Sequence, residues 1–415
     1  MVINTKQIEK ILIFLFFCFL PFQDTILKNT PLGFLGYYLS IFPLFCLILF
    51  LIIIKRKIIL SKSFVLYSIY IIVISVLMNI TYIQESYFFF LNYKVLSNYV
   101  IFTLFYFTAI YIGNINYSLK NVILLAVIVN FAGFVISDYC NFNDGYIIHS
   151  SYDIYSDNLS RLRGFTSESS WYGYLTVLLG GMYATFIERK INKILFIAFM
   201  ILFAIGTGSK GTILCIIFSF IIFLFFKIQN AKMKLYLFLS ITFFIIFLLP
   251  GLFWYLFATD IEKYTSLATR ASSIIAAIDI FIHFPWGTGF GAFIPIFREY
   301  LIKDFRSFEI MTGMILNSTE IEYMALGDIN TKGVAIKSYI FQWITMFGIP
   351  FVFILYKKIK KYFYYFYYIK DWYMISLFSF FIFANLTYST YSFESSAFIG
   401  FLINYYKTNK ELKDC

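Results

Sequence analysis

Apolar stretches of about 20 residues recur along this chain, and they constrain its fold more than any other feature. A helix needs about 20 apolar residues to cross the hydrocarbon core of a bilayer. Charged residues make up only 13% of the sequence, whereas a soluble domain carries about 25%. We therefore predict an all-α, polytopic bundle of transmembrane helices, with a single integral membrane domain over residues 1–415.

The apolar stretches predict about twelve spans. They cover roughly residues 8–22, 33–54, 63–80, 95–113, 121–137, 170–187, 191–206, 211–226, 235–257, 336–356, 372–389 and 391–406.

The basic residues between the predicted spans indicate how the chain lies in the membrane. Cytoplasmic loops of membrane proteins carry an excess of Lys and Arg. If both termini are cytoplasmic, most of the 33 basic residues fall on that side, and the short outer loops hold only Lys28, Lys94, Arg161, Arg163 and Lys210. We expect this topology in the cytoplasmic membrane, and we read the formal net charge of +11 as its result rather than as a sign of nucleic-acid binding.

A long extracytoplasmic loop, residues 258–335, is predicted between the ninth and tenth spans. Loops of this length in compact proteins are usually functional or disordered. Residues 270–284 show a helical pattern that should end at Pro285. The glycine-rich residues 287–291 that follow are predicted to form turns, because no strand precedes them as a phosphate-binding loop would require.

A few charged side chains on the predicted outer side are candidates for chemistry. Charged residues in membrane proteins often mark functional sites. A basic residue at the end of a helix can also lie at the membrane interface without a function. Guanidinium groups bind phosphate oxygens through charge-assisted hydrogen bonds of about 1.5–3 kcal/mol each, so several around one cavity suit a lipid pyrophosphate. His283 is expected to be a core or interfacial side chain. The candidates are Arg161, Arg163, Glu168, Lys210, Arg270 and Lys337.

Several segments on the predicted outer side combine glycines with basic residues. They are residues 161–169 (RLRGFTSES), 205–211 (IGTGSKG), 280–293 (IFIHFPWGTGFGAF) after Arg270, and 337–350 (KSYIFQWITMFGIP). Their composition and order resemble the motifs of bacterial O-antigen and capsular polysaccharide polymerases, which form a superfamily with the O-antigen ligases.

The resemblance, which covers about residues 160–355, implies a glycosyltransferase on the outer face of the cytoplasmic membrane. Such an enzyme joins undecaprenyl-pyrophosphate-linked oligosaccharide repeat units in O-antigen or capsule biosynthesis. Arg161 and Arg270 match the arginines proposed to hold the pyrophosphate in that family. Glu168 could activate the acceptor hydroxyl or could pair with a nearby arginine. The pyrophosphate-binding residues that we expect are Arg161, Arg163, Lys210, Arg270 and Lys337.

Two other functions stay open. An O-antigen ligase is one, but the related ligases usually have His-Asn where this chain has Lys337 and Ser338, which disfavours that interpretation. A lipid-linked glycan flippase or transporter is the other. Transporters tend to carry their charges near the bilayer midplane, whereas in this chain the charges fall at the predicted outer rim.

No cofactor is expected, and the predicted reaction is metal-independent. No His, Cys, Asp and Glu residues recur at metal-ligand spacing, and Asp24 is a lone acid in the first outer loop. The expected partners are the undecaprenyl-pyrophosphate-linked glycan and the lipid bilayer. A chain-length regulator and a flippase are further candidate partners.

Overall fold

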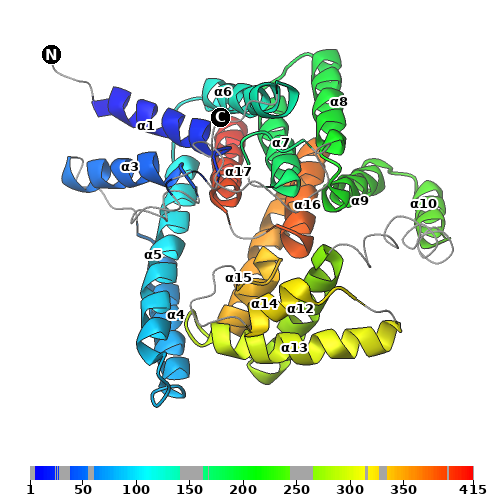
Figure 1. The fold of residues 1–415 in the computed structure, drawn as a ribbon. Coiled ribbons are helices and arrows are strands. Elements are labelled where there is room, and N and C mark those ends of the chain that lie inside the picture. Colours follow the sequence, from blue (N-terminus) through cyan, green and yellow to red (C-terminus); the bar gives the residue numbers. More distant parts are fainter. Residues whose placement is uncertain are drawn as a thin grey trace. The chain divides into compact units, whose positions relative to one another are not determined.

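The computed structural model of the chain is helical throughout its described parts (Figure 1). It describes residues 5–23, 25, 27, 38–54, 60–140, 162–166, 168–243, 265–313, 316–326, 334–389 and 392–414. No strand forms among these residues, and one isolated bridge pairs Gln23 with Tyr38. The all-α fold class is therefore confirmed.

The helices follow one another along the chain from the N-terminus to the C-terminus. They are α1 (Thr5–Phe19), α3 (Ile41–Ile53), α4 (Lys62–Ile80), α5 (Phe88–Gly113), α6 (Lys120–Gly133), the π-helix η2 (Phe134–Tyr139), α7 (Ser169–Ala184), α8 (Lys190–Gly206), α9 (Lys210–Lys227), α10 (Ala231–Phe243), α12 (Thr265–His283), α13 (Phe293–Thr312), α14 (Thr319–Leu326), α15 (Tyr339–Tyr368), α16 (Trp372–Thr387) and α17 (Phe393–Asp414).

Several of these helices are long and apolar enough to cross a membrane, which indicates a membrane protein. In the described part of the chain, 5 segments meet that criterion: Lys62–Ile80, Phe88–Gly113, Lys120–Tyr139, Lys210–Lys227 and Tyr339–Tyr368. Every predicted span overlaps a helix of the structure. The number of spans, the side on which the termini lie and the single membrane domain stay predictions.

The chain divides into two compact units by its internal contacts. Unit 1 comprises Met1–Leu60, Ile101–Ile216 and Tyr391–Cys415, and unit 2 comprises Ser61–Val100 and Ile217–Thr390.

Helix α7 lies at the centre of unit 1, where it packs against α6, α8 and α17. Two fully buried tyrosines give it polar links to its neighbours. The Tyr172 hydroxyl donates to the carbonyl of Asn130 on α6 at 3.0 Å, and the Tyr174 hydroxyl lies 2.9 Å from Ser395 Oγ on α17. Hydrogen bonds of this kind between membrane helices contribute about 0.6–2 kcal/mol each, so they fix the orientation of α7 and of the motif that precedes it.

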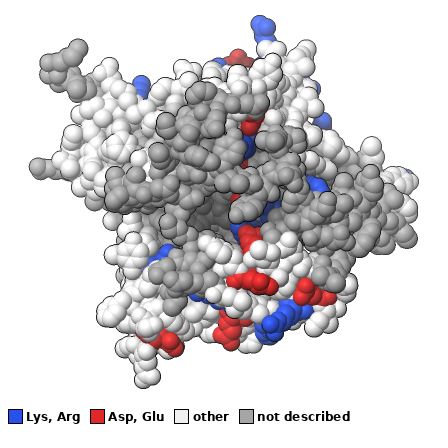
Figure 2. Space-filling view, in the orientation of Figure 1, with Lys and Arg blue, Asp and Glu red and all other residues white. Residues whose placement is uncertain are grey.

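Unit 2 contains the described part of the predicted long outer loop, and most of that part is helical. Helices α12, α13 and α14 pack together, and α12 also packs against α15 (Figure 1). The predicted helix before Pro285 is confirmed, since α12 ends at His283. On the face shown in Figure 2, charged atoms gather over the region of α12 to α14, whereas most of the other described surface is uncharged.

The glycine-rich residues 287–291 pack into a break in α15. Gly348 has φ 60° and ψ −151°, a conformation that is essentially restricted to glycine, and it divides α15 into two helical parts. The loop supplies the hydrogen bonds that the break removes. Thr288 N donates to Thr345 O and Gly289 N to Met346 O, both at 2.9 Å, while Ile349 N donates to Pro285 O at 2.8 Å.

The other side of the same loop contacts α4. Phe290 N donates to Ser75 Oγ at 3.0 Å, and the Tyr70 hydroxyl hydrogen-bonds to the carbonyl of Trp286. A side chain at Gly289 would meet the backbone of Ser75. Turns form at residues 285–286 and 290–292, so the prediction of turns at residues 287–291 is confirmed in part. The glycines at 287 and 289 allow close packing of backbone on backbone.

Candidate functional site

The arginine-containing segment before α7 is held by a carboxylate that the sequence motifs did not reveal. Asp138, on η2, accepts hydrogen bonds through Oδ2 from the backbone N–H groups of Arg163 and Gly164, at 3.0 and 2.7 Å. Hydrogen bonds to a charged acceptor are about twice as strong as neutral ones. Asp138 therefore fixes the backbone of the segment. These two bonds involve only backbone N–H groups, so they do not define the role of the Arg163 side chain.

The glycine and the phenylalanine of this segment both have packing roles. Gly164 has φ 54°, and a Cβ at this position would lie 2.6 Å from the ring of Tyr172. The Phe165 ring stacks on Phe22 with centroids 4.7 Å apart, and the Phe165 carbonyl accepts from Gln23 N at 3.3 Å. The segment is thus docked onto α7 and onto the chain that follows α1.

Arg161, the candidate of this segment that matches the resemblance best, lies outside the described residues. Glu168 is exposed, and its carboxylate accepts a hydrogen bond from Ser170 Oγ at 3.1 Å. Among the described residues Glu168 forms no ion pair. Whether it activates a hydroxyl or pairs with Arg161 therefore stays open.

The turn that carries Lys210 packs against the start of α7. Thr207 and Thr212 are fully buried, and a Cβ at Gly173 of α7 would lie 3.1 and 2.8 Å from their hydroxyl oxygens. A Cβ at Gly206 would lie 3.0 Å from Leu162. Two of the motifs with basic residues are therefore neighbours within unit 1, although they are more than 40 residues apart in sequence.

Lys210 itself is half-buried at the first residue of α9. Its turn is stabilised by side-chain caps, since Thr212 N donates to Ser209 Oγ at 3.3 Å and Ser209 N donates to Thr207 Oγ1 at 3.2 Å. The bond to Ser209 Oγ satisfies the N–H of Thr212, one of the first backbone donors of α9, which would otherwise lack a partner within the helix.

In unit 2 a second unexpected carboxylate, Glu320, connects the other two motifs. Its Oε1 lies 2.9 Å from Lys337 Nζ, and its Oε2 accepts a hydrogen bond from Thr269 Oγ1 at 2.8 Å. Thr269 is fully buried and directly precedes Arg270 on α12. The structure thus brings the Arg270 region and Lys337 together at one carboxylate on α14.

The position of Lys337 makes this part of unit 2 suited to an anion. Lys337 stands just before Ser338, the N-cap of α15, whose Oγ accepts from Phe341 N at 3.4 Å. A cation at the positive end of a helix dipole is unfavourable, so Lys337 needs an anionic partner. In the structure Glu320 is this anionic partner, and a phosphate oxygen of a bound ligand could be a second one. Lys337, Glu320 and Arg270 are all half-buried, so a ligand can reach them.

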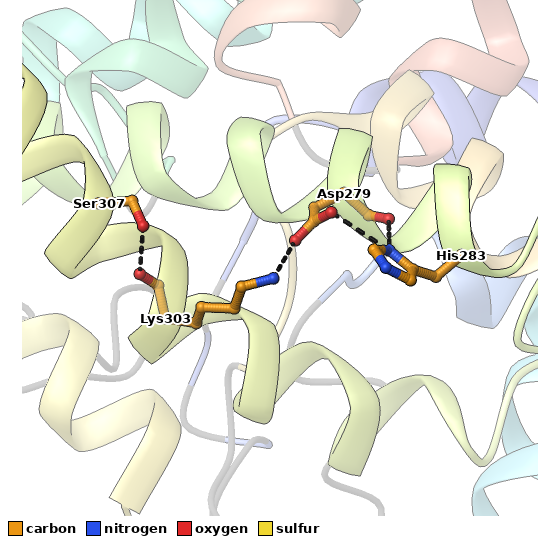
Figure 3. A network of polar contacts seen from close by, with 4 residues as sticks. All are labelled: Asp279, His283, Lys303 and Ser307. Atoms are coloured by element: carbon orange, nitrogen blue, oxygen red, sulfur yellow. Dashed lines mark hydrogen bonds and ion pairs between the residues drawn. The ribbon is translucent and has the colours of Figure 1, made fainter.

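The sequence predicts His283 to be a core or interfacial side chain. The core position is wrong, because the side chain is 51% exposed. Its Nδ1 lies 2.9 Å from the carbonyl of Asp279 and 3.2 Å from Asp279 Oδ1, one helical turn back on α12 (Figure 3). Lys303 of α13 donates to the other carboxylate oxygen at 2.8 Å, and this hydrogen bond raises the pKa of Lys303. Asp304, beside it, is buried, and burial raises the pKa of its carboxyl group.

This His283 cluster is separate from the Arg270 region. The two residues are 13 positions apart on α12, which corresponds to about 20 Å along a helix at 1.5 Å per residue. A group that acts on a hydroxyl next to a bound pyrophosphate must lie within a few ångströms of it. His283 therefore cannot serve a reaction centred on Arg270.

Sequence reasoning missed Asp138 and Glu320 for different reasons. Asp138 is the last acidic residue before a long polar segment, and its spacing from Arg163 gives no sign that the two meet. Glu320 stands on α14, a helix that the sequence did not predict, and its contacts with Thr269 and Lys337 are to residues distant in sequence. Among the described residues no group of three or more His, Cys, Asp and Glu residues could hold a metal ion, and metal independence stays a prediction.

Comparison with known proteins gives limited but specific information. No protein family model matches the chain. The chain is similar to an uncharacterized 49.5 kDa protein in the cps region of Klebsiella pneumoniae, with 29% identity over 282 residues. The matched part covers 64% of this chain and 62% of that protein, so the chain spans less than two thirds of the length of its curated relative.

Proposed function

We propose that this chain is a polysaccharide polymerase that joins undecaprenyl-pyrophosphate-linked oligosaccharide repeat units on the outer face of the cytoplasmic membrane. Capsule biosynthesis is the favoured pathway, because the curated relative lies in a cps, or capsule, region. Apolar helices of membrane-spanning length support a membrane-bound enzyme.

The observation that carries the proposal is the contact of Glu320 with Lys337 and with Thr269, the residue before Arg270, in unit 2. Two motifs more than 60 residues apart in sequence meet there, and each brings a half-buried basic residue, Arg270 or Lys337. In unit 1 the segments of Arg163 and Lys210 are likewise packed together around the start of α7. Convergence of this kind is expected of residues that share a substrate and is not required of cations that only mark topology.

The chemistry proposed for Arg270 and Lys337 is stabilisation of a leaving group. A hydroxyl of the incoming lipid-linked repeat attacks the anomeric carbon of the growing chain, and the bond to the pyrophosphate oxygen breaks. Negative charge develops on that oxygen, and cationic donors placed there beforehand lower the barrier. One lost charge-assisted hydrogen bond of about 1.5–3 kcal/mol corresponds to a reaction slower by about 10- to 150-fold.

Deletion of the gene, followed by electrophoresis of surface glycan, tests this function. We expect the deletion strain to keep single-repeat glycan on its surface and to lose the long chains. Absence of exported glycan would instead identify a flippase or transporter. Chains of normal length that are not attached to their final acceptor would identify a ligase.

Single substitutions in the complemented strain test the site. Arg270→Ala and Arg161→Ala should lose long-chain glycan while the protein level is maintained, and Arg270→Lys should restore part of it, because lysine keeps the charge but not the bidentate fork. Arg306→Ala, an exposed arginine on α13, is the matched control and should behave as wild type. Wild-type chain length in both Arg270→Ala and Arg161→Ala would contradict the proposed site.

A further inference from the structure

We propose that Glu320 is the general base that takes the proton from the acceptor hydroxyl. This inference rests on the proposed polymerase function and deepens it, because that function leaves the base unassigned. The Glu320 side chain is 28% exposed, and both of its oxygens are oriented by donors from other elements: Lys337 before α15 and Thr269 on α12.

The geometry of the reaction limits where the base can stand. The proton acceptor must come within about 2.6–3.2 Å of the hydroxyl, and the hydroxyl oxygen must approach the anomeric carbon to about 3–3.5 Å. That carbon is bonded directly to the pyrophosphate. The base therefore belongs within a few ångströms of the cations that bind the pyrophosphate.

Glu320 meets this requirement through its contacts in the structure. Its Oε1 lies 2.9 Å from Nζ of Lys337, one of the proposed pyrophosphate-binding cations, and its Oε2 accepts a hydrogen bond from Thr269, the residue before Arg270. Other acids of the same unit are less well placed. The Asp279 carboxylate is bonded to Lys303, and Asp279 lies nine positions beyond Arg270 on α12 and so about 14 Å along it. The exposed Glu322 contacts Ser318, just before its own helix, through a 2.6 Å hydrogen bond from Ser318 Oγ, whereas Glu320 contacts Lys337.

The arrangement also connects donor binding with activation of the base. In the structure Lys337 is paired with Glu320, and an arriving pyrophosphate competes with Glu320 for the same ammonium group. Loss of that ion pair increases the basicity of the carboxylate, because a nearby cation favours the charged form. Glu320 thus becomes a stronger base when the donor is in place.

The proposed step is balanced in atoms and charge. The acceptor hydroxyl gives its proton to the Glu320 carboxylate, and its oxygen forms a bond with the anomeric carbon. The bond between that carbon and the pyrophosphate breaks, and its electron pair leaves on the pyrophosphate oxygen. Undecaprenyl pyrophosphate departs, and the protonated Glu320 then returns its proton to water.

Steady-state kinetics of the purified full-length protein with its lipid-linked repeat test the proposal. Glu320→Gln keeps an acceptor for Thr269 but removes the base, so kcat should fall by about 10²–10⁴-fold. Affinity for undecaprenyl pyrophosphate, measured directly, should stay the same or rise, because a competitor for Lys337 is removed. The acidic limb of the pH profile of kcat should disappear. Glu322→Gln, two residues further along the same helix α14, is the control and should keep wild-type kinetics.

Glu320→Asp keeps the carboxylate and shortens its reach, so it should retain the acidic limb with a lower kcat. If the Glu320→Gln protein does not fold and accumulate in the membrane, Glu320→Asp tests the proposal instead. A wild-type kcat in Glu320→Asp would overturn it. Wild-type kcat and pH profile in Glu320→Gln would overturn it as well, while leaving the polymerase function intact. A wild-type protein that does not polymerise lipid-linked repeats would instead refute the proposed function itself.

Discussion

Gly348 provides a direct test of how the glycine-rich loop and α15 depend on each other. At φ 60° and ψ −151° its backbone is in a region that costs a non-glycine residue about 1–3 kcal/mol. A Cβ at Gly348 would also lie 2.5 Å from the Trp286 carbonyl carbon and 2.7 Å from Gly287 N. These neighbours are backbone atoms that cannot rotate away. Overpacking of this kind costs a further 1–3 kcal/mol or so.

Gly313 offers a matched control for the substitution of Gly348 by alanine. Its φ of 66° imposes backbone strain of about 1–2 kcal/mol on alanine, but a Cβ there would meet nothing within 4 Å. Both substitutions add one methyl group and restrict the unfolded chain equally. The excess destabilisation of Gly348→Ala should therefore be mainly the contact term, about 1–3 kcal/mol, which is about a 5- to 150-fold change in the unfolding equilibrium.

Unfolding of the purified protein in mixed detergent micelles, followed by tryptophan fluorescence, measures this difference. Gly348→Ala should unfold at clearly lower denaturing-detergent fraction than Gly313→Ala, and it should also lose activity because the loop is displaced. Equal stability of the two variants would refute the reasoning, since it would mean that the packing of the loop into the break of α15 contributes nothing.

Further predictions concern other parts of the molecule. Asp138→Ala should remove long-chain glycan and make the segment around Arg163 and Gly164 more sensitive to protease, because two backbone donors lose their acceptor at about 1–3 kcal/mol each; Asp138→Asn, which keeps an acceptor oxygen, should be milder. Burial raises the pKa of Asp304 above its usual 3.8, so its ionisation opposes folding, and wild-type stability should fall as pH rises through the raised pKa. Asp304→Asn should accordingly be more stable than wild type at neutral pH and lose that advantage below pH 3.8 in unfolding measurements. Polymerisation by the purified protein should continue after treatment with a chelator such as EDTA, and its abolition would contradict a metal-independent reaction.

The elements with a strong local signal could be predicted from the sequence. Apolar length predicted the helices, and Pro285 with the glycines after it predicted where α12 ends. Helices α13 and α14 were not predicted, because both mix charged and apolar residues and so lack the length of apolar sequence that marks a span. Their hydrophobic residues pack within the unit instead, as Phe297 and Leu301 do.

The contacts of the candidate site could be predicted only in part. Basic residues and glycines are few enough in this chain to stand out, so the segments around Arg163, Lys210, Arg270 and Lys337 were identified. Asp138 and Glu320, the acidic residues that contact three of these segments, were not identified. The contact of Glu320 with Thr269 joins residues 51 positions apart and has no local pattern. Long-range pairs of this kind depend on how helices pack against one another. The periodicity of a single sequence shows which residues share a helix face but not which helices meet.

The break in α15 has a consequence for how this part of the chain forms. The hydrocarbon core offers no water to satisfy a backbone group, and each unsatisfied group there is costly. Without the loop, the carbonyls of Thr345 and Met346 and the N–H of Ile349 would lack the partners that they have in the structure. The broken form of α15 therefore depends on residues 285–289 for these backbone hydrogen bonds. Because residues 285–289 precede α15 in the chain, they have already been synthesised when α15 forms and are present to dock onto the break.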